Sequence, residues 1–407
     1  MSAPAPPQAS DRAAAPFAFG ARIALVYSAL FFFTGLQLPF FPLWLEARGL
    51  SPTEISVVLA LPLVLRVLAS AQLAARADRA RERADLVIAL YALSALAALA
   101  YLVAGGFWAI LLVTALFAFF NNPIVPIIDS LTLSGVRRYG IDYGRVRLWG
   151  SLVFIVANLG GGALLAGYDV ETLLAVLIGA VVAGALLAPL LPRIGPPRRP
   201  REAVLLGSPW RLMAGRRFLL VIVASGLVQA SHALIYGFGS IHWQKAGLSG
   251  TQIGALWATG VMAEVVLFHF SRRLMGRLGA VNLLVAGAAG ATLRWALMPA
   301  EPGLAGLFVL QAMHGLSFGA THLGTMHFLA ESVGEERLGA AQGAAFVVGG
   351  AAMAVAVFAA GPLYGALGAW GFLVMAAVAA AGLALVVAAG GAQPHSAGRG
   401  GETSEAE

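Results

Sequence analysis

Long apolar stretches recur along the whole chain, separated by short joints that are rich in arginine. Hydrophobic residues make up 59% of the 407 residues, and charged residues only 11%. A single water-soluble core cannot bury so much apolar surface, but a bilayer can, and about 20 apolar residues suffice for one helical crossing. The pattern therefore predicts an all-α polytopic membrane protein.

The apolar stretches predict twelve membrane-spanning helices in two groups of six. These cover residues 20–45, 55–76, 86–104, 107–131, 146–167, 170–191, 218–242, 252–270, 280–298, 304–328, 339–360 and 366–389. The predicted organisation is an N-terminal segment 1–19, a six-helix bundle 20–192, a central loop 193–217, a second bundle 218–389 and a tail 390–407. The two terminal segments are rich in small and polar residues and are predicted to be disordered and cytoplasmic.

The basic residues predict the orientation. Of the 26 lysine and arginine residues, only Arg48 and Lys245 fall in joints on the outer side, while Arg66 and Arg294 lie within predicted helices. All the others fall on the opposite side, and cytoplasmic loops carry such an excess. We therefore predict a protein of the cytoplasmic (inner) membrane with both termini in the cytoplasm.

Composition and motifs exclude several classes of function. The positive charges lie in the loops of one membrane face, so the net charge of +7 needs no nucleic-acid partner. The absence of cysteine excludes disulfides and thiolate metal sites. No phosphate-binding loop or catalytic motif occurs. We expect no enzyme activity, cofactor or metal, and a monomer whose partners are lipid, protons and a small-molecule substrate.

The segment after the first predicted helix is repeated after the seventh. Residues 48–56 read Arg-Gly-Leu-Ser-Pro-Thr-Glu-Ile-Ser, and residues 246–254 read Ala-Gly-Leu-Ser-Gly-Thr-Gln-Ile-Gly. A repeat at half the chain length is typical of transporters built from two related bundles with a site between them. The sequence therefore predicts transport by alternating access.

Three further segments carry a resemblance to a known family. They are Leu-Pro-Phe-Phe-Pro-Leu-Trp-Leu at 38–45, Asp-Tyr-Gly-Arg-Val-Arg-Leu-Trp-Gly at 142–150 and His-Gly-Leu-Ser-Phe-Gly-Ala-Thr-His at 314–322. Over residues 20–390 the chain resembles the major facilitator superfamily, in its MFS_1-like branch of phenylpropionate and lactose permeases. The resemblance implies proton symport of a small organic solute, and the leading candidate for that solute is an aromatic carboxylic acid. A sugar or nucleoside symporter, an efflux protein for drug-like solutes and a non-transporting sensor are the alternatives.

Four intramembrane residues are candidates for proton coupling. A charge at bilayer depth costs several kcal/mol, so it needs an internal partner or a function. Glu264 lies well inside the eighth helix, where burial favours the neutral form of a carboxyl group and permits proton exchange near neutral pH. Asp129, His314 and His322 are the other candidates. The alternative is a hydrogen-bonded structural role for Glu264 and the histidines, and an ion pair that braces a cytoplasmic loop for Asp129.

The resemblance to lactose permease implies further roles. Asp129 and Arg147 keep the separation of an acidic residue and an arginine in its sugar site. Arg294 and His314 keep the spacing of its helix-nine arginine and helix-ten histidine. Where lactose permease carries a carboxylate one turn after that histidine, this chain has Ser317. Proton coupling must therefore use one of the other candidates.

The predicted substrate-binding residues are polar or aromatic and lie within predicted helices. They are Arg147, Arg294, Gln37, Asn122, His232, Tyr236, Trp257 and Gln311. The arginines could hold a carboxylate through two parallel hydrogen bonds. Helical spacing places Gln311, His314, Phe318, Thr321 and Thr325 on one face. Hydrogen bonding between helices is the alternative for the uncharged residues. Arg66 is predicted to be a structural charge, and Gly237 and Gly239 to break the seventh helix.

Overall fold

The computed structural model describes residues 16–79, 81–195 and 215–391, called here the first half (up to 195) and the second half (from 215). Within these residues the secondary structure is helical, with no strand. The all-α prediction is confirmed. Most of the predicted N-terminal segment, central loop and tail lie outside the described residues, as does residue 80.

Both halves consist of long helices joined by short turns. The first half contains α1 (Phe19–Ala47), α2 (Pro52–Arg79), α3 (Arg83–Leu99), α4 (Gly106–Asn121), α5 (Ile124–Tyr139), α6 (Tyr143–Gly167) and α7 (Val170–Leu187). The second contains α9 (Arg216–Ala230), α10 (Ala233–Lys245), α11 (Gly250–His269), α12 (Ser271–Leu297), α13 (Gly303–Ala312), α14 (Thr321–Ser332), α15 (Glu335–Leu367) and α16 (Gly371–Gly391). A π-helical segment, η5 (Gly315–Ala320), joins α13 to α14.

These helices are long and apolar enough for a protein that crosses a membrane many times. Ten stretches of the described residues meet that description, and the longest, Arg337–Gly390, contains most of α15 and α16. Each of the intervals predicted from the sequence falls on one of the helices or on a pair of consecutive helices. The chain is therefore a multi-pass membrane protein.

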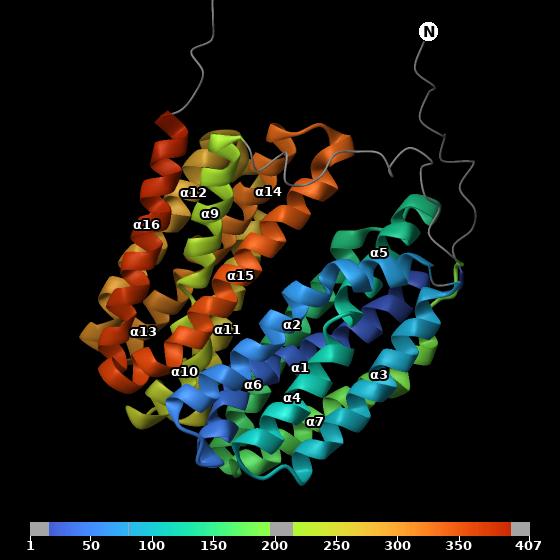
Figure 1. Cartoon of the computed structure of the whole chain (residues 1–407), viewed down its shortest axis with the longest axis horizontal. Coiled ribbons are helices and arrows are strands. Elements are labelled where there is room, and N and C mark those ends of the chain that lie inside the picture. Colours follow the sequence, from blue (N-terminus) through green and yellow to red (C-terminus); the bar gives the residue numbers. More distant parts are fainter. Residues whose placement is uncertain (1–15, 80, 196–214, 392–407) are drawn as a thin grey trace, which may run out of the picture.

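The helices of the two halves form two groups in space (Figure 1). They meet where α1 and α6 pack on α10 and α11, and where α2 packs on α15. Away from these contacts the groups lean apart toward the end where α5 and α14 lie (Figure 1). This arrangement places the inner faces of α1, α6, α10 and α11 around a common centre.

The repeated segment folds the same way in both halves. Gly49 and Gly247 follow α1 and α10 with φ of 80° and 86°, a left-handed conformation that glycine adopts without strain. Two residues later, the backbone N–H of Ser51 donates to the side chain three positions further on, at 2.8 Å. The N–H of Ser249 does the same, also at 2.8 Å. Each pair caps the start of the next helix.

The two halves are in close contact at the end where Gly49 and Gly247 lie, called here the predicted outer end. Gly162 on α6 packs so tightly on α11 that a Cβ atom would lie 2.6 Å from the carbonyl oxygen of Gly250. An ion pair of 2.7 Å joins Glu46, at the end of α1, to Lys245, at the end of α10. The halves are therefore closed against each other at this end.

The seventh predicted helix is broken, but not where its glycines predict. Gly237 and Gly239 lie inside α10, so that prediction is wrong, and the turn falls at Ser231 and His232. There the Ser231 hydroxyl donates to the carbonyl of Val228 at 2.6 Å, and a His232 ring nitrogen lies 3.1 Å from the same oxygen. These side chains satisfy a carbonyl that the interrupted helix leaves unpaired.

Candidate substrate-binding site

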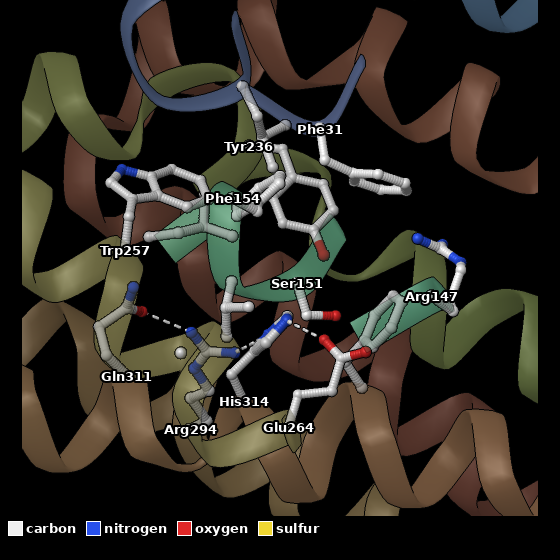
Figure 2. A pocket seen from close by; sticks show the side chains of 15 residues that line it. Phe31, Arg147, Ser151, Phe154, Tyr236, Trp257, Glu264, Arg294, Gln311 and His314 are labelled. Carbon is white, nitrogen blue, oxygen red and sulfur yellow. Dashed lines mark hydrogen bonds and ion pairs between the residues drawn. The ribbon is translucent and has the colours of Figure 1, made fainter. Parts of the chain in front are cut away.

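A cavity of about 220 Å³ lies between the halves, where α1 and α6 face α10, α11, α12, α13 and η5 (Figure 2). Seven of the predicted site residues line it: Arg147, Tyr236, Trp257, Glu264, Arg294, Gln311 and His314. They come from five segments of the chain: α6, α10, α11, α12, and α13 with its continuation into η5. The fold therefore brings together residues that lie far apart in the sequence, from Arg147 to His314.

One side of the cavity is aromatic. Phe31, Phe154, Tyr236 and Trp257 lie on this side (Figure 2), and Phe318 also lines the cavity, stacked on His314. The rings of Tyr236 and Trp257 stack with their centroids 6.1 Å apart. The Trp257 indole N–H donates to the Ser240 hydroxyl at 2.9 Å, which fixes the ring. Such a wall suits a flat aromatic group.

Arg294 is the buried cation of the site, with a side chain that is only 1% exposed. It donates to the amide oxygen of Gln311, to the hydroxyl of Ser317 at 3.1 Å and to Nδ1 of His314 at 3.2 Å. Its guanidinium lies 4.4 Å from the ring centroid of Trp295. All these partners are uncharged, and no carboxylate of the described residues forms an ion pair with Arg294.

Glu264 and His314 face each other across the cavity floor (Figure 2). Oε2 of Glu264 lies 3.8 Å from Nε2 of His314, and the two side chains are 23% and 12% exposed. Gly260, one turn before Glu264, packs against His314: a Cβ atom there would lie at an ordinary contact distance of 3.4 Å from the Cβ atom of His314. The pair is close enough for an ion pair whenever the histidine is protonated.

The first half contributes a second cation. Asp142 caps the start of α6 by accepting the N–H of Arg145 at 3.1 Å. From this start, helical spacing puts Arg147, Ser151 and Phe154 on one face, and all three line the cavity. The Arg147 guanidinium lies 4.1 Å from the ring centroid of Phe31. Figure 2 shows Arg147 on the far side of the cavity from Arg294.

Three predicted residues lie beside the cavity without lining it. His232 is fully buried behind it, with Nε2 at 3.1 Å from the Ser317 hydroxyl. His322 stacks on Phe318 with centroids 6.3 Å apart, on α14. Gln37 is half-buried on α1, next to the lining residue Leu38. His232 alone of these three bonds to a residue that touches Arg294.

Two other predicted residues pack within the first half. Asp129 on α5 accepts hydrogen bonds from the hydroxyls of Tyr27 and, at 3.1 Å, Tyr143. Asn122, at the break between α4 and α5, donates to the carbonyl of Pro62 on α2 at 2.9 Å. These contacts connect α5 with α1 and α6, and the α4–α5 break with α2.

Arg66 contacts the other half of the protein instead of the cavity. Its guanidinium lies 5.3 Å from the ring centroid of Phe346 on α15, a cation–π distance. The contact accompanies the packing of α2 on α15. A structural role for Arg66 remains the prediction that fits this position.

The π-helical segment decides which side chains of the predicted polar stripe reach the cavity. Gln311, His314 and Phe318 line it. Thr325 faces α9 instead, with its hydroxyl 2.7 Å from that of Ser225. A π-helical turn changes the helical register, so the three-and-four spacing predicts the first part of the stripe correctly and the rest incorrectly.

Comparisons with known proteins agree with this architecture. Residues 21–376 match the MFS_1 like family. The chain is 37% identical over 368 residues to the probable 3-phenylpropionic acid transporter of Escherichia coli (strain K12), covering 88% of this chain and 94% of that protein. It is 31% identical over 303 residues to maltose permease of Geobacillus stearothermophilus, covering 72% and 75%.

A solved structure has the same fold. The crystal structure of the nucleoside transporter NupG matches with a TM-score of 0.81 at 16% identity, covering 92% of this chain and all of that one. The resemblance that the sequence motifs carry is thus confirmed. The chain belongs to the MFS_1 like family of membrane transporters and is not an enzyme.

Proposed function

We propose that this protein is a proton-coupled symporter of an aromatic carboxylic acid, with 3-phenylpropionate as the first compound to test. It acts as a monomer in the cytoplasmic membrane, with twelve crossings in two pseudo-symmetric six-helix bundles and both termini in the cytoplasm. The relative named for 3-phenylpropionic acid supports this class of solute. The halves rock against each other around the cavity between them.

The observation that carries the proposal is the position of Arg294 beside the aromatic wall. A buried cation without an anionic partner is costly, and a bound carboxylate relieves that cost through charge-assisted hydrogen bonds. The rings of Tyr236, Trp257 and Phe154 line the same cavity. A solute with a carboxylate at one end and a phenyl ring at the other fits both features.

Glu264 and His314 supply the proton-coupling part of the proposal. They lie in the same cavity as Arg294, within 3.8 Å of each other. A proton carried on this pair offsets the charge of the solute anion. Because the halves are in contact at the predicted outer end, the described arrangement corresponds to the state closed on that side.

A sugar or nucleoside is the second candidate solute. Gln311 and Ser151 supply amide and hydroxyl groups in the cavity, and one relative is a maltose permease. A neutral solute, however, leaves the charge of Arg294 without a counter-ion. We therefore rank it second.

The test is uptake of 3-phenylpropionate into vesicles that contain the purified protein, driven by an alkaline interior. We expect accumulation that disappears without the gradient. Arg294→Gln should weaken binding at least ten-fold, because loss of one partner of a buried charged hydrogen bond costs about 2–5 kcal/mol. Glu264→Gln should bind the acid but not accumulate it.

Two outcomes would contradict the proposal at different points. The neutral alcohol 3-phenylpropan-1-ol is the comparison ligand because it lacks the carboxylate. If Arg294→Gln binds 3-phenylpropionate as tightly as the unaltered protein does, Arg294 is not the carboxylate site. Unchanged accumulation in Glu264→Gln would remove the proton role of that residue. Vesicles that stay impermeable to aromatic acids, sugars and nucleosides under every gradient would leave the sensor alternative.

A further inference from the structure

Hydrogen-bond chemistry fixes where the protons lie around His232. Its Nδ1 is 3.1 Å from the carbonyl oxygen of Val228 and 3.2 Å from that of Gln229. A carbonyl oxygen can only accept, so Nδ1 carries the hydrogen and Nε2 is the acceptor. Ser317, whose hydroxyl lies 3.1 Å from Nε2, therefore donates to it.

The same reasoning fixes the proton on His314. A guanidinium can only donate, so Arg294 donates through one nitrogen both to the Ser317 oxygen at 3.1 Å and to Nδ1 of His314 at 3.2 Å. Nδ1 is then an acceptor, and the neutral ring carries its hydrogen on Nε2, which faces Glu264. A second proton, placed on Nδ1, would point at the Arg294 N–H that donates there, so this hydrogen bond keeps His314 neutral.

Building on the proposed function, we propose that the substrate carboxylate takes this hydrogen bond of Arg294 away from His314, and that the freed Nδ1 then binds the transported proton. A hydronium ion of the aqueous solution supplies the proton: its O–H bond breaks, an N–H bond forms at the Nδ1 lone pair, and neutral water remains. The anion and the proton enter together, so the net charge of the cavity is unchanged. When the substrate leaves, Arg294 returns to Nδ1 and the proton is released.

Among the described residues, Arg294 is the one cation with a hydrogen bond to His314, and in the proposed scheme the substrate carboxylate replaces that contact. The titratable and charged groups that face His314 or share its cavity are Arg294 from α12, His232 from the α9–α10 turn, Tyr236 from α10, Glu264 from α11 and Arg147 from α6. Glu264 favours protonation of His314, and the two arginines oppose it. Phe318 stacks on His314 at 5.1 Å and separates it from His322.

Ser317 acts in this scheme as a positioning residue. Its hydroxyl hydrogen is donated to Nε2 of His232, so its oxygen accepts the hydrogen bond from Arg294 through a lone pair. The serine holds the guanidinium without neutralising it, which a carboxylate at that position would do. Arg294 therefore keeps its charge for an incoming anion.

Calorimetric titration of 3-phenylpropionate into the purified full-length protein, in buffers of different ionisation enthalpy, counts the protons taken up per ligand. We expect about one proton near neutral pH. His314→Gln keeps an acceptor for Arg294, so it should bind the acid but take up close to none. His242→Gln, a histidine on α10 that does not line the cavity, should behave like the unaltered protein.

Nitrogen NMR of histidine-labelled protein supplies a second measurement. His314 should show one protonated ring nitrogen in the protein without ligand and two protonated ring nitrogens when 3-phenylpropionate is bound. Proton uptake on ligand binding that survives in His314→Gln but disappears in Glu264→Gln would overturn the inference. Ligand binding without any proton uptake would overturn it as well. Failure of every aromatic carboxylate to bind would instead overturn the proposed function, and this inference with it.

Discussion

Arg294 is surrounded by acceptors that carry no charge. Gln311, Ser317 and His314 each offer one lone pair to its guanidinium. These bonds lower the cost of burying the group but leave its charge uncompensated. A charge in this condition inside a membrane protein indicates a function, and the function proposed for Arg294 is the binding of a substrate anion.

At the scale of single residues, Phe154 tests the aromatic side of the cavity. Phe154→Ala should weaken binding of 3-phenylpropionate roughly ten-fold, since the lost ring contact and burial are together worth about 1–3 kcal/mol. Calorimetry with the purified variant measures this loss. Phe358→Ala is the matched control, because that ring is 56% exposed on α15. Equal affinities of the two variants would contradict the aromatic contact.

The sequence predicts some of these residues better than others. Arg294 and Glu264 can be identified because a charge in an apolar stretch is expensive and therefore conspicuous. Phe154 cannot, since phenylalanine is common on lipid-facing surfaces. Ser151 shares a helix face with Arg147, one turn apart, so helical spacing from Arg147 is the one signal that could have identified it.

At the scale of the helices, the regular parts follow from the sequence and the irregular parts do not. The turn at Ser231 and His232 contains no proline or glycine, so no local signal predicts it. The π-helical segment η5 depends on packing: a Cβ atom on Gly315 would lie 2.7 Å from the carbonyl oxygen of Ala263 on α11. Only the folded neighbour reveals that constraint.

The contact of α6 with α11 gives a prediction at this scale. Gly162→Ala should lower the thermal stability of the purified protein and slow uptake, because its Cβ atom would meet backbone and such overpacking costs about 1–3 kcal/mol. Gly160→Ala lies two residues away on the same helix with nothing within 4 Å, and should change neither. Identical melting temperatures for the two variants would contradict the tight contact.

At the scale of the whole molecule, helix positions and the pairing of helices differ in how well they can be predicted. Apolar length predicts where the helical regions lie, because each crossing must span the same thickness, but it does not predict the breaks within them. Periodicity shows which face of a helix is polar, but not which other helix that face will meet. Asn122 and Asp129 illustrate this: they are seven residues apart, yet Asn122 bonds to α2 and Asp129 to Tyr27 and Tyr143.

The ion pair between Glu46 and Lys245 gives a prediction for the movement of the halves. Lys245→Glu places two carboxylates together and should shift the protein toward separation at the predicted outer end. The double variant Glu46→Lys with Lys245→Glu should restore the original balance. The pair is 30% and 59% exposed, so removing its attraction changes the populations no more than about five-fold.

Spin labels measure this shift directly. The chain contains no cysteine, so Val103→Cys and Trp370→Cys create two defined attachment points, one in each half at exposed sites. The distance distribution between the labels should move to longer values in Lys245→Glu and return in the double variant. An unchanged distribution in Lys245→Glu would show that this ion pair does not hold the halves together.

Two irregular segments of the described backbone lie close to the cavity, the α9–α10 turn and η5, and both belong to the second half. Arg294, His314 and Gln311 lie in that half as well, while α6 brings Arg147 from the other side. An anion bound to Arg294 would therefore stay attached to the second half while the two halves change their relative orientation. The first half, which contributes fewer polar contacts to the anion, would move relative to the bound anion and open its exit path.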